Sequence, residues 1–540
     1  MSSDVVIYGA TGAGFVAAVA ASRTGCRHVT LISTSGHVGG MLTSGLQHTD
    51  SANASVIGGI TREFFERVEM RYPGRPTNAS YPPGHKPPGW LFESHVAQSV
   101  LNGMLAEANV SVVRHQLGLR RVVLEAQSVR SIETDAQRVF AASVFIDASY
   151  EGDLVATAAG SVTWGRESAA QYRERSAGRR PGVKPYGGAT VNPYWNATAR
   201  PLRVLPHVAL ARPVGVGQAD RWIEAYDFRL CMTNSPGYRV PIERPDDYNA
   251  SEWEFWRRVY GQRPPRTLAE AGLYCLGPIP NSYGDCGPSG KEECKKCDML
   301  GETDLLGGSW GYVNGTAAAR AAIWQAHLRY TRGLLWFWSS DAAVPHGVRS
   351  EIGELGHCRD EYDAASPPHW PPQLYVREAR RVVGDFVWTE WEPPAAIALR
   401  TVGLGSYTFD CHWVSRVVHT TASPTTDYVV AEGRVNNGAH GQPVPGVMQT
   451  PFVIPYDVMV PKARETTNVL VPVAISATHI RFNAIRMEPT WMILGHAAGV
   501  AAAMLANEST LGSPPLLPVQ SLDVIELQQR LKHQHQRLRL

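Results

Sequence analysis

Glycines gathered in one turn near the start of the chain constrain the fold more than any other feature. Residues 4–8 form a short apolar run of β type, and Gly9-Ala-Thr-Gly-Ala-Gly14 follows. Residues 15–24 are rich in alanine, and residues 29–32 are again apolar and of β type. This order predicts a strand, a tight turn, a helix and a second strand. The turn needs glycine because the backbone reverses and because a phosphate can approach the N–H groups of the helix. The segment therefore predicts a dinucleotide-binding unit.

The glycine spacing does not match one template completely. Gly-x-Gly-x-x-Gly fits Gly9 and Gly14, but Thr11 stands at the middle position. Gly-x-x-Gly-x-x-Gly fits Gly9 and Gly12 but fails at Phe15, and the Tyr-x-x-x-Lys pair that accompanies it in short-chain dehydrogenases is absent from the sequence. Ser33 ends the second strand, where a carboxylate for the ribose hydroxyls is expected. A serine hydroxyl can still bond a ribose.

Two further strand ends carry residues that suit a bound ligand. Residues 35–45 form a second glycine-dense loop, which is interleaved with Met41 and Leu42. Residues 140–147 predict a buried strand that ends at Asp147 and continues into a turn. Because α/β sheets bind ligands at the carboxyl ends of their strands, these segments are expected to meet at one site.

The length of 540 residues exceeds what one hydrophobic core supports, so we expect more than one domain. The middle of the chain is rich in Pro, Trp, Tyr and Arg, whereas an α/β pattern returns in a strand at 468–474 and a helix at 490–505. We predict an α/β protein with a discontinuous nucleotide-binding domain and an inserted α+β substrate or lid domain. The predicted boundaries are 1–165 and 451–540 for the first domain, which ends in an amphipathic helix, and 166–450 for the second.

Composition excludes some classes of partner. The 51 basic and 49 acidic residues give a net charge of +2, which does not favour nucleic-acid binding. The most apolar stretches are short or broken by glycine, so no membrane association is expected. The first residues lack a secretory signal pattern, and a cytoplasmic location is expected. The sequence contains seven Asn-x-Ser/Thr sequons, and we favour chance as their explanation. The alternative is a mature secreted protein whose leader has been removed. The sequons begin at Asn53, Asn78, Asn109, Asn196, Asn249, Asn314 and Asn507.

The cysteines divide into two groups. Four lie within one Gly/Pro/Lys-rich loop, and the pair Cys294 and Cys297 has the spacing of a metal knuckle or a redox pair. Because a second close pair is missing, a disulfide-linked or solvated loop is favoured and no metal site is expected. The scattered cysteines are expected to be small buried apolar residues, namely Cys26, Cys231, Cys358 and Cys411.

Six stretches, in order along nearly the whole chain, together resemble the FAD-dependent oxidoreductases. They are residues 8–14, 36–41, 45–50, 145–153, 373–381 and 485–491. The resemblance is to glutathione-reductase-like flavoproteins, and within them to a subfamily sometimes labelled xanthan-lyase-like. It implies a Rossmann-like FAD-binding domain, FAD as the cofactor, and hydride transfer between the flavin and a small organic substrate. Carbohydrate-like substrates are suggested only by the subfamily label and the 15 tryptophans, for which burial is the commoner explanation.

The resemblance also assigns expected roles around FAD. The pyrophosphate would lie against Gly9, Thr11, Gly12 and Gly14, and Ser33 would replace the usual glutamate at the adenosine ribose. The ribityl and flavin region would lie along Gly39, Gly40 and Met41. A later strand end would contact FAD through Asp147, Gly152 and Asp153. The helix facing the isoalloxazine would begin at Glu488, Pro489 and Thr490.

Oxidation of an alcohol or amine also needs a base near the flavin, and histidine suits neutral pH. The candidates are His412, His479 and His48, each of which could equally be a structural histidine. Arg377 is a candidate for binding a carboxylate, or for an ion pair with a nearby acid. Asp410 could orient His412. Two other functions stay open from the sequence: a nicotinamide-dependent dehydrogenase, and a binding protein that keeps the fold without catalysis.

Overall fold

The computed structural model describes residues 1–48, 50–72, 90–184, 188–210, 214–278, 296–301, 303–436, 451–507 and 511–539. These residues group into two compact units. Unit 1 comprises Met1–Trp164, Glu378–Asp410 and Asn436–Leu540, and unit 2 comprises Gly165–Arg377 and Cys411–Val435. The predicted inserted domain was continuous from 166 to 450, whereas in the structure Glu378–Asp410 groups with unit 1.

The described part of unit 1 contains a sheet of seven strands, whose centre is parallel. The parallel neighbours are β3 (Ser111–Val113), β2 (Val29–Ile32), β1 (Ser2–Tyr8) and β6 (Val139–Asp147), with β20 (Val469–Leu470) parallel to the end of β6. The antiparallel strands β5 (Ser128–Thr134) and β4 (Leu119–Glu125) extend the sheet beyond the start of β6. Tyr8 pairs with both Ile32 and Asp147, so three strands end level with one another. The predicted Rossmann-like α/β fold is confirmed.

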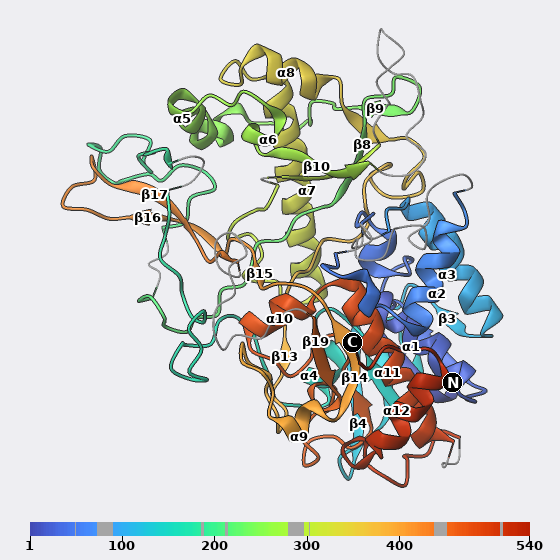
Figure 1. Ribbon diagram of the computed structural model, residues 1–540. Helices are drawn as coiled ribbons and strands as arrows, with labels where there is room; N and C mark the ends of the chain where they lie inside the picture. Colours follow the sequence, from blue (N-terminus) through green and yellow to red (C-terminus); the bar gives the residue numbers. More distant parts are fainter. Residues whose placement is uncertain are drawn as a thin grey trace. The chain divides into compact units, whose positions relative to one another are not determined.

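Helix α1 (Gly12–Arg23) follows β1 and packs along α11 (Glu488–Ala506), although the two lie at opposite ends of the sequence (Figure 1). Gly495 and Gly499 face the backbone carbonyls of Ala13 and Ala17 so closely that a Cβ at either glycine would overlap them. α11 carries apolar residues on every side, and nearly all of its residues are buried. By length and composition it is the one described helix that could cross a membrane, and 94% of its most apolar window is buried inside the protein, as in a core helix.

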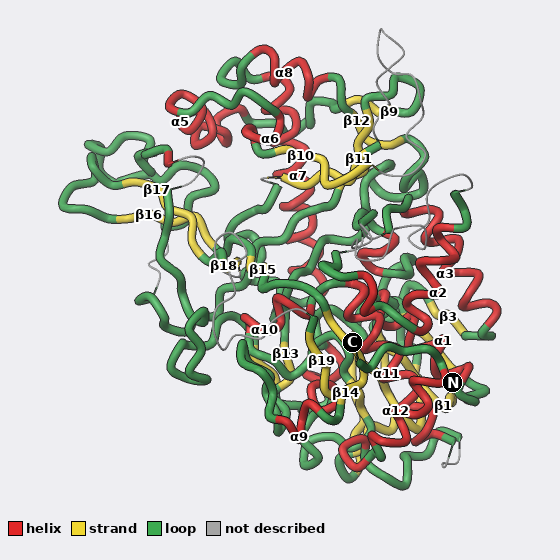
Figure 2. Tube along the Cα trace, viewed as in Figure 1, coloured by secondary structure: helices red, strands yellow, loops and turns green. Residues whose placement is uncertain are grey.

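Short helices and strand pairs surround these elements in unit 1 (Figure 2). The helices are α2 (Gly59–Glu69), α3 (Ser94–Glu107), α4 (Asp153–Thr157), α9 (Ala395–Ala398), α10 (His479–Ile485) and α12 (Val524–His533), with single turns η1 (Gly40–Thr43), η2 (Ala54–Val56), η6 (Tyr456–Met459) and η7 (Val519–Ser521). The strand pairs are β7 (Val162–Thr163) with β13 (Arg381–Val382), and β14 (Thr401–Gly405) with β19 (Phe452–Pro455).

Unit 2 is built on a second sheet and an aromatic core. Its strands run in the order β10 (Leu273–Pro278), β11 (Cys297–Gly301), β8 (Leu230–Thr233), β12 (Gly356–Cys358) and β9 (Arg239–Pro241). Its helices are η5 (Ala250–Trp253), α5 (Glu254–Gln262), α6 (Leu268–Ala271), α7 (Ala317–Ser340) and α8 (His346–Gly353), and β16 (Ser415–His419) pairs with β17 (Tyr428–Glu432). β15 (Asp410–Cys411) and β18 (Val435–Asn436) lie at the unit boundaries. Trp253, Trp256 and Trp338 are fully buried, so these tryptophans form the core and offer no face to a ligand.

Two sequence predictions are wrong in detail. The strand predicted at 468–474 is limited to Val469–Leu470, because Pro472 cannot donate to a sheet ladder. Cys231 and Cys358 are buried as expected, yet they form a disulfide with each other rather than standing alone. The loop at 279–295 lies outside the described residues, although Cys297 at its end is itself disulfide-bonded.

Candidate functional site

The turn between β1 and α1 is held in shape by its one threonine. Thr11 caps α1, because its hydroxyl oxygen accepts a hydrogen bond from the Gly14 N–H at 3.2 Å. The same hydroxyl donates to the carbonyl of Ala148 at 2.8 Å and thereby ties the turn to the end of β6. Gly9 has φ +105°, and a Cβ there would overlap the backbone of Ser149. Thr11 therefore replaces the template glycine with a side chain that joins two strand ends.

The loop after β2 and the turn after β6 meet beside this turn. The Gly39 N–H donates to the Ala10 carbonyl at 2.7 Å, and the Met41 N–H donates to the hydroxyl oxygen of Tyr150 at 3.0 Å. Gly40 has φ +56°, and a Cβ there would overlap that same hydroxyl. The glycines at 39 and 40 thus allow the loop to lie against Tyr150 and the glycine-rich turn.

Glu488, in the first turn of α11, completes this cluster of segments. The Tyr150 hydroxyl donates to Glu488 Oε1, and a Cβ on Gly12 would lie 2.7 Å from Oε2. Oε2 is buried and has no hydrogen-bond partner among the described residues, and the same holds for the indole N–H of Trp491. Burial raises the pKa of Glu488 to about 8, while the hydrogen bond from Tyr150 lowers it in part.

These features fit a dinucleotide cofactor. The amino ends of α1 and α11 lie together at Glu488 and Gly12, and helix amino ends attract negative charge. Glycines keep side chains out of the turn, and the two unpartnered buried atoms are of the kind that a bound ligand satisfies. The residues able to hold such a cofactor are Gly9, Thr11, Gly12, Gly14, Gly39, Gly40, Met41, Tyr150, Glu488 and Trp491. Sequence reasoning missed Tyr150 and Trp491, although both lie within the stretches that carried the resemblance.

Other residues predicted to contact the cofactor have structural roles at the strand ends. The Ser33 hydroxyl donates to the His37 carbonyl at 2.6 Å rather than pointing away unpaired. Asp147 accepts hydrogen bonds from the Ser149 hydroxyl at 2.6 Å and from the Val155 N–H at 2.9 Å, so it shapes the turn into α4. Burial raises the pKa of Asp147 to about 7, against the effect of these hydrogen bonds.

The remaining predicted positions lie at helix starts. Gly152 has φ +65° at the N-cap of α4, and Asp153 forms an ion pair of 2.7 Å with Arg380. Pro489 and Thr490 lie in the first turn of α11, whose N-cap is Met487 rather than the predicted position next to Thr490.

The three candidate histidines lie in different surroundings. His48 has a side chain that is 25% exposed, its Nε2 lies 3.5 Å from Asp50 Oδ1, and its Nδ1 is buried without a partner among the described residues. His479 is buried at the start of α10, where its carbonyl accepts from the Asn483 amide. His412 is 22% exposed, and its Nδ1 lies 3.0 Å from Asp304 Oδ2. The ring of His412 is therefore within hydrogen-bonding distance of the Asp304 carboxylate.

Arg377 contacts the carboxylate oxygen of Asp304 that His412 does not. It is fully buried, with NH1 2.9 Å from Asp304 Oδ1 and NH2 3.1 Å from Asp227 Oδ1. NH1 also donates to the Ala225 carbonyl at 2.6 Å. Burial alone would raise the pKa of Asp304, but the charges of Arg377 and His412 hold it below its usual value. Arg377 therefore forms ion pairs with two aspartates inside unit 2.

Sequence reasoning did not find Asp304, which is 108 residues from His412 and carries no motif. The predicted alternative, Asp410, instead pairs with Arg486, whose NH2 lies 3.1 Å from Asp410 Oδ2. No signal in the sequence separates these two aspartates, because the contact with His412 depends on how unit 2 folds.

Comparison with known proteins places the chain in one family. The fold and the glycine cradle define a dinucleotide-binding α/β protein. The model of the family described as "FAD dependent oxidoreductase" matches residues 4–531. The chain therefore belongs to the family of FAD-dependent oxidoreductases. A search of curated proteins finds no match.

Solved structures show local likeness. Thi4 of Thermovibrio ammonificans is 20% identical, with 29% of this chain and 60% of that chain covered and a TM-score of 0.22. NikD, an amino acid oxidase of nikkomycin biosynthesis, is 15% identical, with 31% and 57% covered and a TM-score of 0.22. The anhydrotetracycline hydroxylase OxyS of Streptomyces rimosus is 14% identical, with 31% and 36% covered and a TM-score of 0.22. The matched region therefore spans less than two thirds of each of these chains.

The raised pKa of Glu488 predicts how the stability of the cofactor-free protein depends on pH. Between about 4.5 and about 8, the folded protein keeps a proton that the unfolded chain has lost. Stability should therefore fall as pH rises through this range, by about 1.4 kcal/mol per pH unit for one such group. Glu488→Gln should remove this contribution, which urea unfolding midpoints at several pH values would measure.

Tyr150 contacts Glu488 directly, through the hydrogen bond that its hydroxyl donates to Oε1. Asp147 has a raised pKa of its own, so some slope should persist in the Glu488→Gln variant up to a pH of about 7. The exposed Glu351 on α8 supplies the matched control, and Glu351→Gln should leave the pH slope unchanged. Equal slopes for the parent and Glu488→Gln would contradict the expectation.

Proposed function

We propose that this flavoenzyme transfers a hydride between a small organic substrate and FAD, with His412 as the base. The observation that carries the proposal is the 3.0 Å contact between His412 Nδ1 and Asp304. A carboxylate at Nδ1 fixes the tautomer, so that the other ring nitrogen can accept a proton. Bound FAD supplies the acceptor for the hydride and its two electrons.

The roles of the other residues follow from their contacts. As the hydride leaves the substrate carbon, the hydroxyl or amine proton passes to His412, which leaves a carbonyl or an imine. Asp304 orients His412 and balances the charge that the ring gains. Arg377 holds Asp304 in its ionised form from the buried side. Arg377 is thus a positioning residue in this proposal, because its guanidinium is committed to two aspartates.

For the cofactor, we propose that the pyrophosphate lies at the turn of Gly9, Thr11, Gly12 and Gly14. The unpartnered Oε2 of Glu488 and the indole N–H of Trp491 support a ligand at the amino end of α11. The bond from the Ser33 hydroxyl to His37 argues for a ribose held mainly by other groups. These residues bind and orient the cofactor and exclude water from it.

The substrate class is proposed more broadly, as an alcohol or amine of small size. Carbohydrate-like molecules are included because Trp222 and Trp310, stacked at 4.1 Å, are only partly buried in unit 2 and could offer a ring face. The test is anaerobic mixing of the purified flavoprotein with sugars, polyols, amines and hydroxy acids. Bleaching of the flavin absorption by one class would identify it, and the absence of bound flavin in protein supplied with FAD would overturn the proposal.

A further inference from the structure

The sequons are too numerous and too consistently exposed to be a product of composition. The chain has 15 asparagines, and seven of them begin an Asn-x-Ser/Thr sequon. Roughly one residue in eight is Ser or Thr, so about two of the 15 would fall in a sequon by chance. The excess indicates selection for the pattern itself and not for serine or threonine content.

The folded chain leaves these asparagines accessible. Six of the seven lie in described residues, of which Asn53 is partly exposed and the other five are exposed: Asn109, Asn196, Asn249, Asn314 and Asn507. By contrast, Asn468 and Asn483 are fully buried, and neither begins a sequon. Asn78 lies outside the described residues. A glycan needs an asparagine at the surface, and the described sequons meet that condition.

Three sequons share one local arrangement, in which the asparagine side chain is held through its oxygen. The Asn196 Oδ1 accepts from both the N–H and the hydroxyl of Thr198, at 2.9 and 2.8 Å. Asn249 makes the same pair of bonds with Ser251, at 3.1 and 2.8 Å. Asn53 does so with Ser55. Because the oxygen carries both bonds, Nδ2 of each side chain is not needed by the fold among the described residues.

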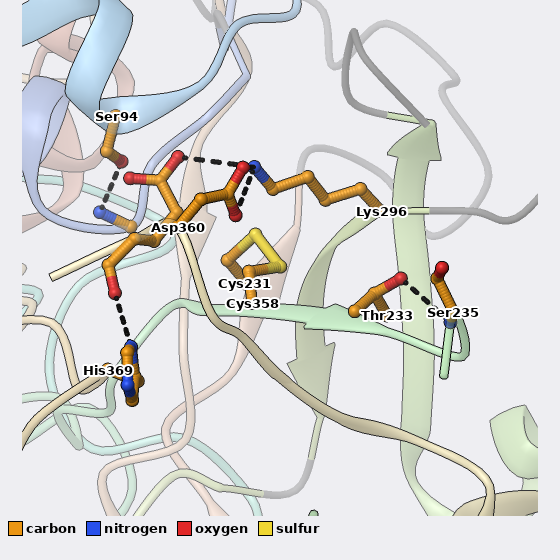
Figure 3. Close-up of a disulfide and its surroundings, with 10 residues drawn as sticks. Ser94, Cys231, Thr233, Ser235, Lys296, Cys358, Asp360 and His369 are labelled. Carbon is orange, nitrogen blue, oxygen red and sulfur yellow. Dashed lines mark hydrogen bonds and ion pairs between the residues drawn. A yellow bond between two sulfur atoms is a disulfide. The ribbon is translucent and has the colours of Figure 1, made fainter. Parts of the chain in front are cut away.

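The disulfides point to the same compartment by independent means. Cys231 on β8 and Cys358 on β12 are joined across 127 residues, with both side chains buried (Figure 3). Cys297 on β11 is disulfide-bonded as well. Such bonds persist in oxidising compartments and are rare in the cytosol. N-linked glycosylation takes place in a compartment of this kind.

We propose that this flavoenzyme is an N-glycosylated protein of the secretory route, with glycans at Asn196, Asn249 and Asn314 in unit 2 and at Asn53 and Asn109 in unit 1. The modification forms a bond between Asn Nδ2 and the anomeric carbon of an oligosaccharide donor. The donor carries a diphosphate leaving group, which departs as Nδ2 loses one proton. No change of oxidation state is involved.

The test uses the full-length protein from the cells that make it naturally. Peptide mapping before and after enzymatic release of N-glycans in heavy-oxygen water should show glycosylated sequon peptides and their conversion to labelled aspartate. Asn234 is exposed but lacks a sequon, so its peptide should stay unmodified and acts as an internal control. Unmodified peptides at all of the sequons would overturn the proposal, whatever the state of the cysteines.

Two further measurements test the proposal independently of peptide mapping. One removes a single sequon, and the other reports on the oxidation state of the cysteines. Ser251→Ala removes the sequon while keeping Asn249, and should delete that one glycan without loss of bound flavin. Alkylation under denaturing, non-reducing conditions should label the free thiols of Cys26 and Cys411 but not Cys231 or Cys358. Labelling of Cys231 and Cys358 equal to that of Cys26 would contradict an oxidising route.

Discussion

Replacement of His412 by glutamine is expected to slow reduction of the flavin by substrate about 10²- to 10⁴-fold, the range by which general bases accelerate reactions. Glutamine keeps much of the size of the side chain and can still bond Asp304, but it cannot take up the substrate proton. FAD content and the unfolding midpoint should stay near the parent values. Anaerobic stopped-flow measurement of flavin bleaching, with the substrate found in the panel, gives the rate directly.

The substitution Asp304→Asn tests the carboxylate that orients His412. An amide at position 304 no longer fixes the same tautomer of His412, so the rate should fall and the lower limb of its pH profile should move. His419→Gln is the matched control, because His419 is an exposed histidine of the same unit that packs on Tyr428. If His412→Gln bleaches as fast as His419→Gln, His412 is not the base, and His48→Gln becomes the variant to measure.

Gly495→Ala is expected to cost about 3 kcal/mol of stability in unit 1, at the upper end of overpacking effects. Alanine favours helices by about 1 kcal/mol over glycine, so propensity alone predicts the opposite sign. The added Cβ would overlap the Ala13 carbonyl, and backbone cannot rotate away as the end of a side chain can. The two helices must then separate, which also displaces Glu488 from Gly12. FAD affinity should therefore fall together with stability.

Gly103→Ala provides the control for this variant. Gly103 lies within α3, and a Cβ there meets nothing within 4 Å. This substitution should be neutral or stabilising, by up to about 1 kcal/mol. Urea unfolding and FAD titration of both variants form the comparison. Equal stability of Gly495→Ala and the parent would mean that the contact between α1 and α11 is looser than the structure has it.

The glycine-rich turn and the parallel strands could be predicted because their signals are local. A strand, a turn with glycines and an alanine-rich helix follow one another directly between residues 4 and 24, and backbone geometry dictates that order. The cofactor residues predicted by resemblance stay predictions, although Glu488 and Gly12 do lie together. The start of α11 was displaced by two residues, since Pro489 is accepted within a first helical turn.

The partners of charged side chains could not be predicted, since they depend on contacts between distant segments. Arg377 was a candidate for substrate binding, yet it is enclosed by Asp227 and Asp304, which are 150 and 73 residues away in sequence. The disulfide between Cys231 and Cys358 joins strands of a sheet that the sequence did not reveal. Pro472 likewise shortened the predicted strand at 468–474 to Val469–Leu470.

The pairing of α1 with α11 has a consequence for synthesis on the ribosome. The helix that follows the first strand emerges near the beginning of translation, whereas its packing partner begins at residue 488. Through that interval the apolar surface of α1 lacks the helix that covers it, and such surfaces are where chaperones bind and where aggregation starts. The glycine-rich turn is thus made first, and the helix that completes its surroundings is made nearly last.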